Sequence, residues 1–241
     1  MSLYRDDAIV LRSWKLGEAD RIVSLHTRGH GKVRGVAKGV RRTRSKFGAR
    51  LEPTSHIAIQ LYRGRGELDT ITQVETIDRF VRLRSDPARF ARASAMLEAV
   101  DQLAQDREPD GGRHLMLTRA LATLDQQESP LVVAGFFLKL LAHEGVQPEL
   151  DMCVSCGEPG PIEAIDFREG GVLCRACRRG RPVSEPALGL MRQILGGELS
   201  GVLRQPVSGV TGEVEELATD AMEVHLERRL RSVAVLDQER T

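Results

Sequence analysis

Hydrophobic and polar positions alternate in short β-branched segments over most of the first 80 residues, a pattern typical of strands. Glycine, arginine-rich or acidic residues separate these segments. In "HIAIQLY" the alternation puts Ile57, Ile59 and Leu61 on one face. Five strands with almost no helical periodicity between them predict a small barrel, and an SH3-like barrel fits nearly as well. The predicted strands cover residues 8–17, 21–27, 31–40, 55–64 and 68–77.

The periodicity becomes helical near residue 82. Ser85 is expected to cap a first helix, Pro87 lies in its first turn, and apolar residues then recur at intervals of three and four. After a second helix, a third is expected to begin at the cap Ser129 and to end at Gly145. The sequence thus predicts an α+β multidomain chain, with a barrel domain over residues 1–81 and an all-α domain over 82–241. The other expected helices lie near 113–127, 184–197 and 212–233.

Four cysteines in two Cys-x-x-Cys pairs interrupt the helical half. Seventeen residues separate the pairs, and glycines and prolines near both pairs suit tight ligand turns. Two such turns supply four thiolates for a tetrahedral zinc ion. We therefore predict one structural Zn²⁺ in a module over residues 150–182, because all four ligand positions are filled; four core cysteines or a redox pair fit less well. The predicted ligands are Cys153, Cys156, Cys174 and Cys177.

Charge is distributed unevenly in a chain whose formal net charge is only +1. Residues 1–84 carry 18 Lys or Arg against 9 Asp or Glu, and residues 21–51 carry ten basic residues and no acidic residue. A block of one sign in one half predicts a polyanionic partner, although a basic face that only keeps the domain soluble is the alternative. A second basic edge beside the cysteines is either an anion contact or a solvated surface; it comprises Arg175, Arg178, Arg179 and Arg181.

The basic block divides into a strand and a loop. Lys32, Arg34 and Lys38 are expected on one strand face, with small residues on the other, and "RRTRSKFGAR" is expected to be an exposed loop. Such a surface can follow a phosphate backbone without reading sequence. Phe47, set among charges, is the best candidate to stack on a base, whereas Trp14 and Tyr62 are expected in the core.

Catalytic motifs are not found in the sequence. It has no glycine-rich loop ending in Gly-Lys-Ser or Gly-Lys-Thr, no His-Glu-x-x-His, no Gly-x-Ser-x-Gly and no tight acidic cluster. We therefore expect a binding protein rather than an enzyme. The longest apolar run, "LVVAGFFL", has eight residues and is too short for a membrane span. Without a signal peptide, we expect a cytoplasmic protein with reduced cysteines and no membrane partner.

Three segments together resemble the bacterial RecO family of DNA repair and recombination proteins. They are "IVLRSWKLGEADRIVSLHTRGHGKVRGVAKGVRR", "LEPTSHIAIQLYRGRGELDTITQVE" and the paired cysteines inside a helical half. The resemblance covers the whole chain and is most specific over residues 8–75. It implies an N-terminal OB-fold, then a helical domain with a zinc module. Because not all members keep the cysteines, zinc here depends on the spacing in this chain.

The resemblance also implies a function. Members are recombination mediators that bind single- and double-stranded DNA, anneal complementary strands and act at the nucleoid. They work with RecR, and often RecF, to load RecA onto strands coated by single-stranded-DNA-binding protein. A zinc-ribbon RNA-binding or ribosome-associated protein, or a nuclease, remains an alternative. The DNA-binding residues that the resemblance implies are Lys32, Arg34, Lys38, Arg41, Arg42, Arg44, Lys46 and Arg50.

Overall fold

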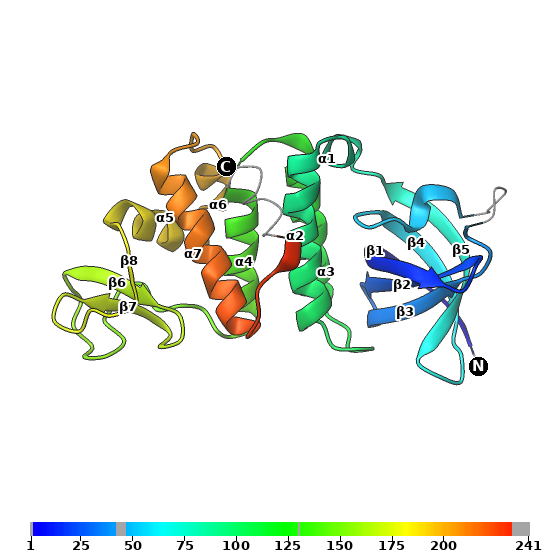
Figure 1. Cartoon of the computed structure of the whole chain (residues 1–241), viewed down its shortest axis with the longest axis horizontal. Helices are drawn as coiled ribbons and strands as arrows, with labels where there is room; N and C mark the ends of the chain where they lie inside the picture. The colour runs from blue at the N-terminus through cyan, green and yellow to red at the C-terminus, as the bar shows by residue number, and fades with distance from the viewer. Residues whose placement is uncertain (1, 42–46, 130, 233–241) are drawn as a thin grey trace. The chain divides into compact units, whose positions relative to one another are not determined.

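The computed structural model describes residues 2–41, 47–129 and 131–232 of the chain. Its N-terminal strands form a closed barrel in the order β1-β2-β3-β5-β4, with β1 also paired to β4 (Figure 1). All strand pairs are antiparallel except β3 with β5, which are parallel. This is an OB-like barrel, and it resolves the choice left open with the SH3-like alternative. The strands are β1 (Leu3–Leu16), β2 (Asp20–Thr27), β3 (Gly31–Ala37), β4 (His56–Tyr62) and β5 (Leu68–Asp78).

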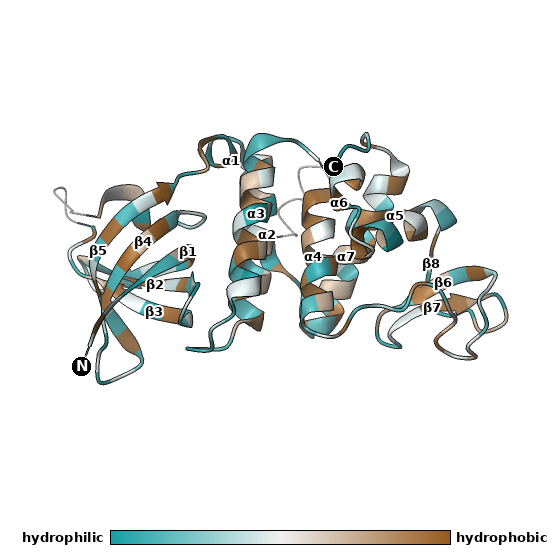
Figure 2. Cartoon of the chain, turned by 180° about the vertical axis from the view of Figure 1, so that it is seen from behind, coloured by the Kyte–Doolittle hydropathy of each residue, from teal (hydrophilic) through white to brown (hydrophobic). Residues whose placement is uncertain are grey.

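The barrel core is built from the alternating apolar positions of these strands. Ile57, Ile59 and Leu61 of β4 are buried together, as predicted, while Ala58 between them is exposed. Hydrophobic and hydrophilic residues are interspersed along the barrel strands (Figure 2). A short 3₁₀ helix, η1 (Gly48–Leu51), adds Leu51 to the same cluster. The predicted five-stranded barrel is therefore confirmed.

A β-bulge in β1 changes which side chains face the core. Val10 pairs with Leu25 and Arg12 pairs with Ser24, so that Leu11 has no partner of its own across the ladder. An extra residue of this kind reverses the alternation beyond it. As a result, Trp14, which has the same parity as the buried Val10, is 36% exposed.

Three helices follow the barrel and belong to the same compact unit, which comprises residues 1–126 and 230–241. They are α1 (Val81–Ser85), α2 (Pro87–Leu103) and α3 (Gly111–Gln126). The prediction that Ser85 caps the first long helix is wrong. Asp86 is the cap, because its carboxylate accepts hydrogen bonds from two backbone N–H groups of the first turn, while the Ser85 hydroxyl donates to the carbonyl of Arg82.

The segment between α2 and α3 packs directly against β3. The backbone N–H of Lys32 donates to the carbonyl of Gln105, and the N–H of Arg107 donates to the carbonyl of Lys32. The approach is so close that a Cβ added to Gly31 would lie 1.9 Å from the carbonyl oxygen of Glu108. Gly31 also has a φ of +66°, so only glycine suits this position.

Asp69 is the centre of a buried polar network in this unit. Its side chain is fully buried, accepts a hydrogen bond from the Tyr4 hydroxyl at 2.5 Å and pairs with the Arg107 guanidinium at 3.0 Å. Burial alone would raise the pKa of Asp69. Hydrogen bonds from Arg107, Tyr4 and the Gly64 backbone lower the pKa below its usual value of 3.8.

The second compact unit, residues 127–229, is helical with a small sheet inserted. The apolar helix α4 packs against α5 and α7, and Leu138, Leu140 and Leu141 are among its buried residues. Ser129 accepts a hydrogen bond from the Leu131 N–H at the start of α4. The elements are α4 (Leu131–His143), β6 (Ile162–Asp166), β7 (Gly171–Cys174), β8 (Arg181–Pro182), α5 (Glu185–Leu195), α6 (Leu199–Val202) and α7 (Gly209–His225).

The predicted domain limits coincide with the change from strands to helices near residue 82. The boundary between the two compact units of the structure instead falls after Gln126, because α2 and α3 contact the barrel strands. The limits 1–81 and 82–241 therefore remain a prediction. Within the described ranges, no helix is long and apolar enough to cross a membrane.

Asp69→Asn is expected to lower the free energy of unfolding of the barrel unit by about 2–4 kcal/mol, because the Arg107 guanidinium loses its buried partner. The folded-state pKa of Asp69 is lowered, so the wild-type contribution is complete above the unfolded pKa of about 4 and is lost as pH falls through the folded value. Urea unfolding followed by the single tryptophan, Trp14, at several pH values measures both effects.

The exposed Glu75→Gln variant is the matched control for this experiment. It should unfold like the wild type, and Asp69→Asn should show a shallower loss of stability on acidification below about pH 5. Equal stabilities and equal pH slopes for all three proteins would contradict the role of the network.

Candidate nucleic-acid interface and metal centre

Two of the predicted DNA-binding residues lie on β3 but are engaged within the protein. The Lys32 Nζ donates to the Asp101 carbonyl at 2.8 Å, and its side chain is only 18% exposed. The Arg34 guanidinium pairs with Asp106 at 2.8 Å and with Glu67 at 3.1 Å. These contacts hold the segment 101–106 and the β4–β5 turn against the barrel, so both cations already have intramolecular partners.

The next two residues lie beyond the strand. Gly39, with a φ of +67°, is part of a turn after Ala37, so the predicted extension of the strand to residue 40 is wrong. Lys38 is therefore not on the face of β3, and it is exposed. Arg41 is also exposed, and its guanidinium donates to the Glu18 carbonyl at 2.8 Å, which places it beside the β1–β2 turn.

The central part of the predicted loop lies outside the described residues. Arg42, Arg44 and Lys46 fall in the segment 42–46. The described residues on either side of that segment are Arg41 and Phe47, so the chain enters it beside the β1–β2 turn and leaves it at the start of η1.

The structure reverses the predicted burial of the three aromatic residues near the basic block. Phe47 is 1% exposed and belongs to the barrel core, so it cannot stack on a base. Trp14 and Tyr62, expected in the core, are 36% and 38% exposed. The Arg12 guanidinium lies 5.6 Å from the Trp14 ring centroid, a cation–π contact on the outer surface of the barrel.

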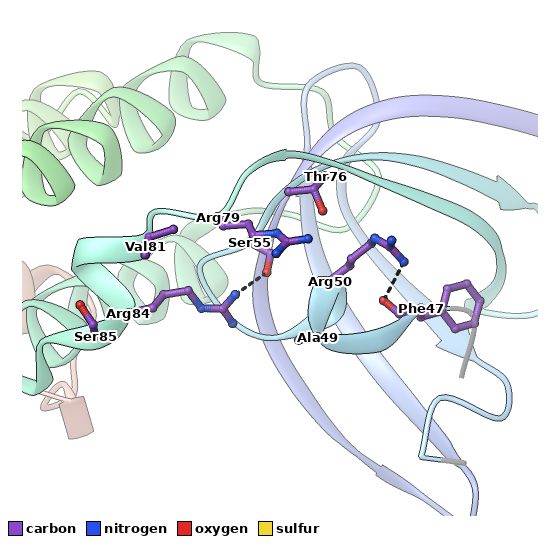
Figure 3. A pocket seen from close by; sticks show the side chains of 9 residues that line it. All are labelled: Phe47, Ala49, Arg50, Ser55, Thr76, Arg79, Val81, Arg84 and Ser85. Carbon is purple, nitrogen blue, oxygen red and sulfur yellow. Dashed lines mark hydrogen bonds between the residues drawn. The ribbon is translucent and has the colours of Figure 1, made fainter. Parts of the chain in front are cut away.

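A cleft of about 530 Å³ adjoins the C-terminal side of the loop (Figure 3). Arg50 of η1, Arg79 after β5 and Arg84 of α1 all line it, and the Arg84 guanidinium donates to the Ser55 hydroxyl at 3.3 Å. Three arginines therefore line one cleft and give it a positive charge. The sequence prediction named Arg50 but not Arg79 and Arg84, which lie outside the block of basic residues.

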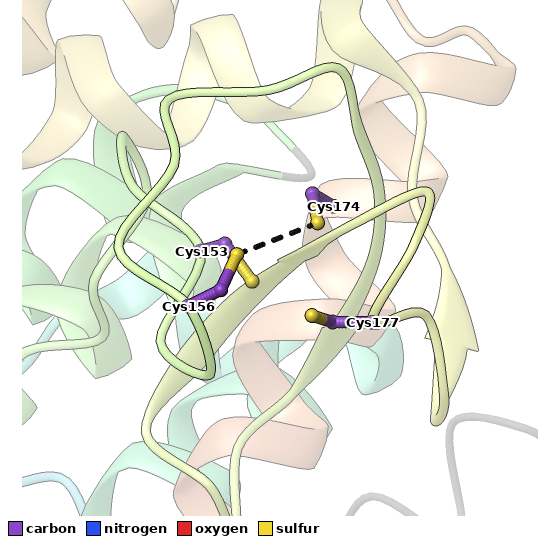
Figure 4. A group of neighbouring side chains, drawn as sticks. All are labelled: Cys153, Cys156, Cys174 and Cys177. Atoms are coloured by element: carbon purple, nitrogen blue, oxygen red, sulfur yellow. Dashed lines mark hydrogen bonds between the residues drawn. The ribbon is translucent and has the colours of Figure 1, made fainter.

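The four cysteines meet at one point (Figure 4). Their sulfur atoms all lie within 4.8 Å of one another, and the Cys156 and Cys174 sulfurs are 3.7 Å apart. Each pair occupies a tight turn, in which the N–H of Gly157 donates to the carbonyl of Cys153 and that of Cys177 to the carbonyl of Cys174. This arrangement can bind one metal ion through four thiolates.

The thiols of the cluster differ in their acidity. Backbone N–H groups, chiefly that of Cys174, lower the pKa of Cys153 to about 6. The backbone hydrogen bond at Glu158 lowers the pKa of Cys156, but hydrogen bonding with the Cys153 thiol and its neighbours outweighs this and raises it to about 12. A bound metal ion would stabilise the thiolate form of such neighbouring thiols, because its positive charge offsets the repulsion between them.

The basic edge beside the cysteines is paired with acidic residues. Glu163 binds Arg175 at 2.5 Å and Arg178 at 2.9 Å. Arg179 pairs with Glu169, and Arg181 pairs with Asp220 at 2.6 Å and with Glu216. Of the two interpretations left open by the sequence, these ion pairs favour a surface balanced within the protein over an anion contact.

The barrel and the helical region define the class, an OB-like protein with a four-cysteine cluster that can bind a metal ion. Comparison with protein families gives two matches. "Recombination protein O N terminal" matches residues 1–80, and "Recombination protein O C terminal" matches residues 84–234. The chain belongs to the recombination protein O (RecO) family, and its role is in recombination and DNA repair. The resemblance found in the sequence is thereby confirmed.

The cysteine cluster of the purified protein is expected to hold about one tightly bound metal ion per chain. Cys174→Ser should remove that ion, because three thiolates and a hydroxyl bind far more weakly than four thiolates. Ser155→Ala, an exposed change within the first Cys-x-x-Cys turn, should leave the metal content unchanged. Elemental analysis after gel filtration measures the ratio, and equal metal content in wild type and Cys174→Ser would contradict the site.

Proposed function

We propose that this chain is a recombination mediator that binds single- and double-stranded DNA without sequence specificity and anneals complementary strands. With RecR, it promotes loading of RecA onto DNA coated by single-stranded-DNA-binding protein, and RecF is a further partner. It acts at the nucleoid in the cytoplasm and without catalysing a covalent reaction. The observation that carries the proposal is the match of both RecO family models over nearly the whole chain.

The barrel surface near the β1–β2 turn supports this proposal. OB-folds bind oligonucleotides with the strand 2–3 face and the loops after strands 1 and 4. Here Lys38 and Arg41 adjoin the β1–β2 turn, and Arg12 and Trp14 lie on the strand that leads into it. We propose that the phosphate backbone runs over this surface and past Arg42, Arg44 and Lys46 to the cleft of Arg50, Arg79 and Arg84.

Lys32 and Arg34 have a less direct role in the proposed DNA binding, because both are already paired within the protein. DNA would have to compete with Asp106 for both side chains, since its carboxylate lies 3.8 Å from Lys32 Nζ and 2.8 Å from the Arg34 guanidinium. We propose that they add to the positive field near the DNA, while the exposed Lys38 and Arg41 form direct contacts.

We propose that the metal in the cysteine cluster is Zn²⁺ in a structural role. Zinc accepts four thiolates in a tetrahedral arrangement, and a site with four protein ligands leaves no open position for chemistry. The module has a small core of its own, formed by Cys153, Ala164, Leu173 and Cys174, so the ion would supply much of its cohesion.

The triple substitution Arg41→Ala, Arg42→Ala and Arg44→Ala is expected to slow annealing of two complementary oligonucleotides and to weaken binding to single strands. Removing three phosphate contacts should also make the slope of log affinity against log salt shallower by about 2. Fluorescence anisotropy at several salt concentrations and a strand-annealing assay measure these effects.

The triple change of Arg175, Arg178 and Arg179 to Ala is the matched control, because it removes the same charge from side chains that are already paired. It should retain DNA affinity and annealing. Loss of binding in the control alone would move the site to the cysteine module. Wild-type protein that does not accelerate annealing would favour the RNA-binding or ribosome-associated alternative, and metal-dependent shortening of the oligonucleotides would indicate a nuclease.

Trp14 is expected to stack on a base. DNA should therefore quench the fluorescence of this single tryptophan, and Trp14→Ala should weaken single-strand binding by about 1–3 kcal/mol. Trp14→Phe keeps an aromatic face and should retain most of the affinity, which separates stacking from loss of fold. An affinity for Trp14→Ala equal to that of the wild type would contradict the stacking role.

A further inference from the structure

A second cluster of metal-ligating side chains lies in the barrel unit. It joins Asp7 of β1, His56 at the start of β4 and His114 in the first turn of α3. One ligand atom from each residue lies within 4.8 Å of the other two. The Asp7 Oδ1 atom is 2.6 Å from His56 Nε2 and 3.3 Å from His114 Nε2. Neither the cysteine cluster nor the proposed DNA surface uses these residues.

The hydrogen bonding of His114 fixes which of its nitrogens faces the carboxylate with a lone pair. Its Nδ1 lies 3.3 Å from the backbone carbonyl of His26, and a carbonyl oxygen can only accept. Nδ1 therefore carries the hydrogen, and Nε2 of the neutral ring is an acceptor. Among the described residues, this buried Nε2 has no hydrogen-bond partner, although the Asp7 oxygen is close. A cation placed between the Nε2 lone pair and the Asp7 carboxylate would satisfy both acceptors.

Both imidazole rings are held in position before any ion binds. The His56 ring is stacked on Phe80, with centroids 6.5 Å apart and planes 5° from parallel. The His26 carbonyl orients the His114 ring, and such a contact from the second nitrogen is the usual support of a metal-bound histidine. The Asp7 side chain is 33% exposed, which leaves a route from solvent and room for water ligands.

The donor atoms indicate the class of ion. Two imidazole nitrogens and one carboxylate oxygen suit divalent transition metals such as zinc, whereas calcium and magnesium prefer oxygen alone. Ligand atoms around a tetrahedral zinc ion are about 3.4 Å apart, given bonds of about 2.1 Å. The pair of Asp7 and His114 already has this spacing at 3.3 Å. The pair of Asp7 and His56 is a hydrogen bond that an ion would replace, with a shift of less than ~1 Å.

We propose that Asp7, His56 and His114 form a second site for a divalent transition-metal ion, with zinc as its representative. The ion would connect two barrel strands to α3, and it would stabilise this unit through binding to the folded state alone. The site is independent of the cysteine cluster and of DNA binding.

Zinc stoichiometry of the full chain tests the proposal. After equilibrium dialysis against micromolar Zn²⁺ at neutral pH, the wild type should contain about one more zinc ion per chain than His114→Gln or His56→Gln. His30→Gln is the matched control, because His30 forms a similar pair with Asp6 at 2.5 Å but is not part of the cluster. It should bind as much zinc as the wild type, and the comparison holds whether or not the cysteines bind metal.

A measurement on the unmodified protein covers the case in which a variant does not fold. Nitrogen-15 NMR of the histidine side chains should show that Zn²⁺ shifts the Nε2 resonances of His56 and His114 and leaves the His30 ring unchanged. Equal zinc content in the wild type and all three variants, or unchanged Nε2 resonances in the wild type with excess zinc, would overturn the proposal.

Discussion

The parallel pairing of β3 with β5 is the constraint on which the N-terminal unit depends. It pairs Gly35 with Asp69 and Val36 with Thr70, and it closes a sheet whose other pairs are all antiparallel. The antiparallel pairing of β2 with β3, in which Arg21 lies opposite Ala37, sets the β1–β2 turn beside the residues that follow β3. The parallel pairing sets Asp69 beside β3, where Arg107 reaches it from the segment between α2 and α3. The barrel and its helices are thereby joined through buried charge as well as apolar packing.

The surroundings of β3 explain why the basic block of the sequence is divided in the structure. On β3, Lys32 and Arg34 face the acidic segment that follows α2, so their charges connect the barrel to its helices. Beyond Ala37 the chain leaves the sheet, and Lys38 and Arg41 are exposed. A uniform run of positive charge in the sequence is therefore partly structural and partly available to a polyanion.

Local patterns allowed much of this fold to be predicted. Alternation marked the strands, and the spacing of Cys153, Cys156, Cys174 and Cys177 predicted one thiolate cluster, because these signals need only neighbouring residues. Trp14 was misplaced because the bulge at Leu11 reverses the pattern. Phe47 was misplaced because a charged sequence context does not show that a residue turns inward to the core. The pairing of Arg34 with Asp106 spans 72 positions, and no periodicity contains such a contact.

The histidine cluster shows the same limit, since Asp7, His56 and His114 are brought together only by the tertiary fold.

DNA is proposed to bind the barrel surface at the β1–β2 turn and the residues after β3. Hydrogen–deuterium exchange of the full chain with and without a single-stranded oligonucleotide tests this proposal most directly. Our account predicts slower exchange at residues 14–20 and 38–50 on DNA binding, with residues 161–182 unchanged. Slower exchange confined to residues 161–182 would contradict it.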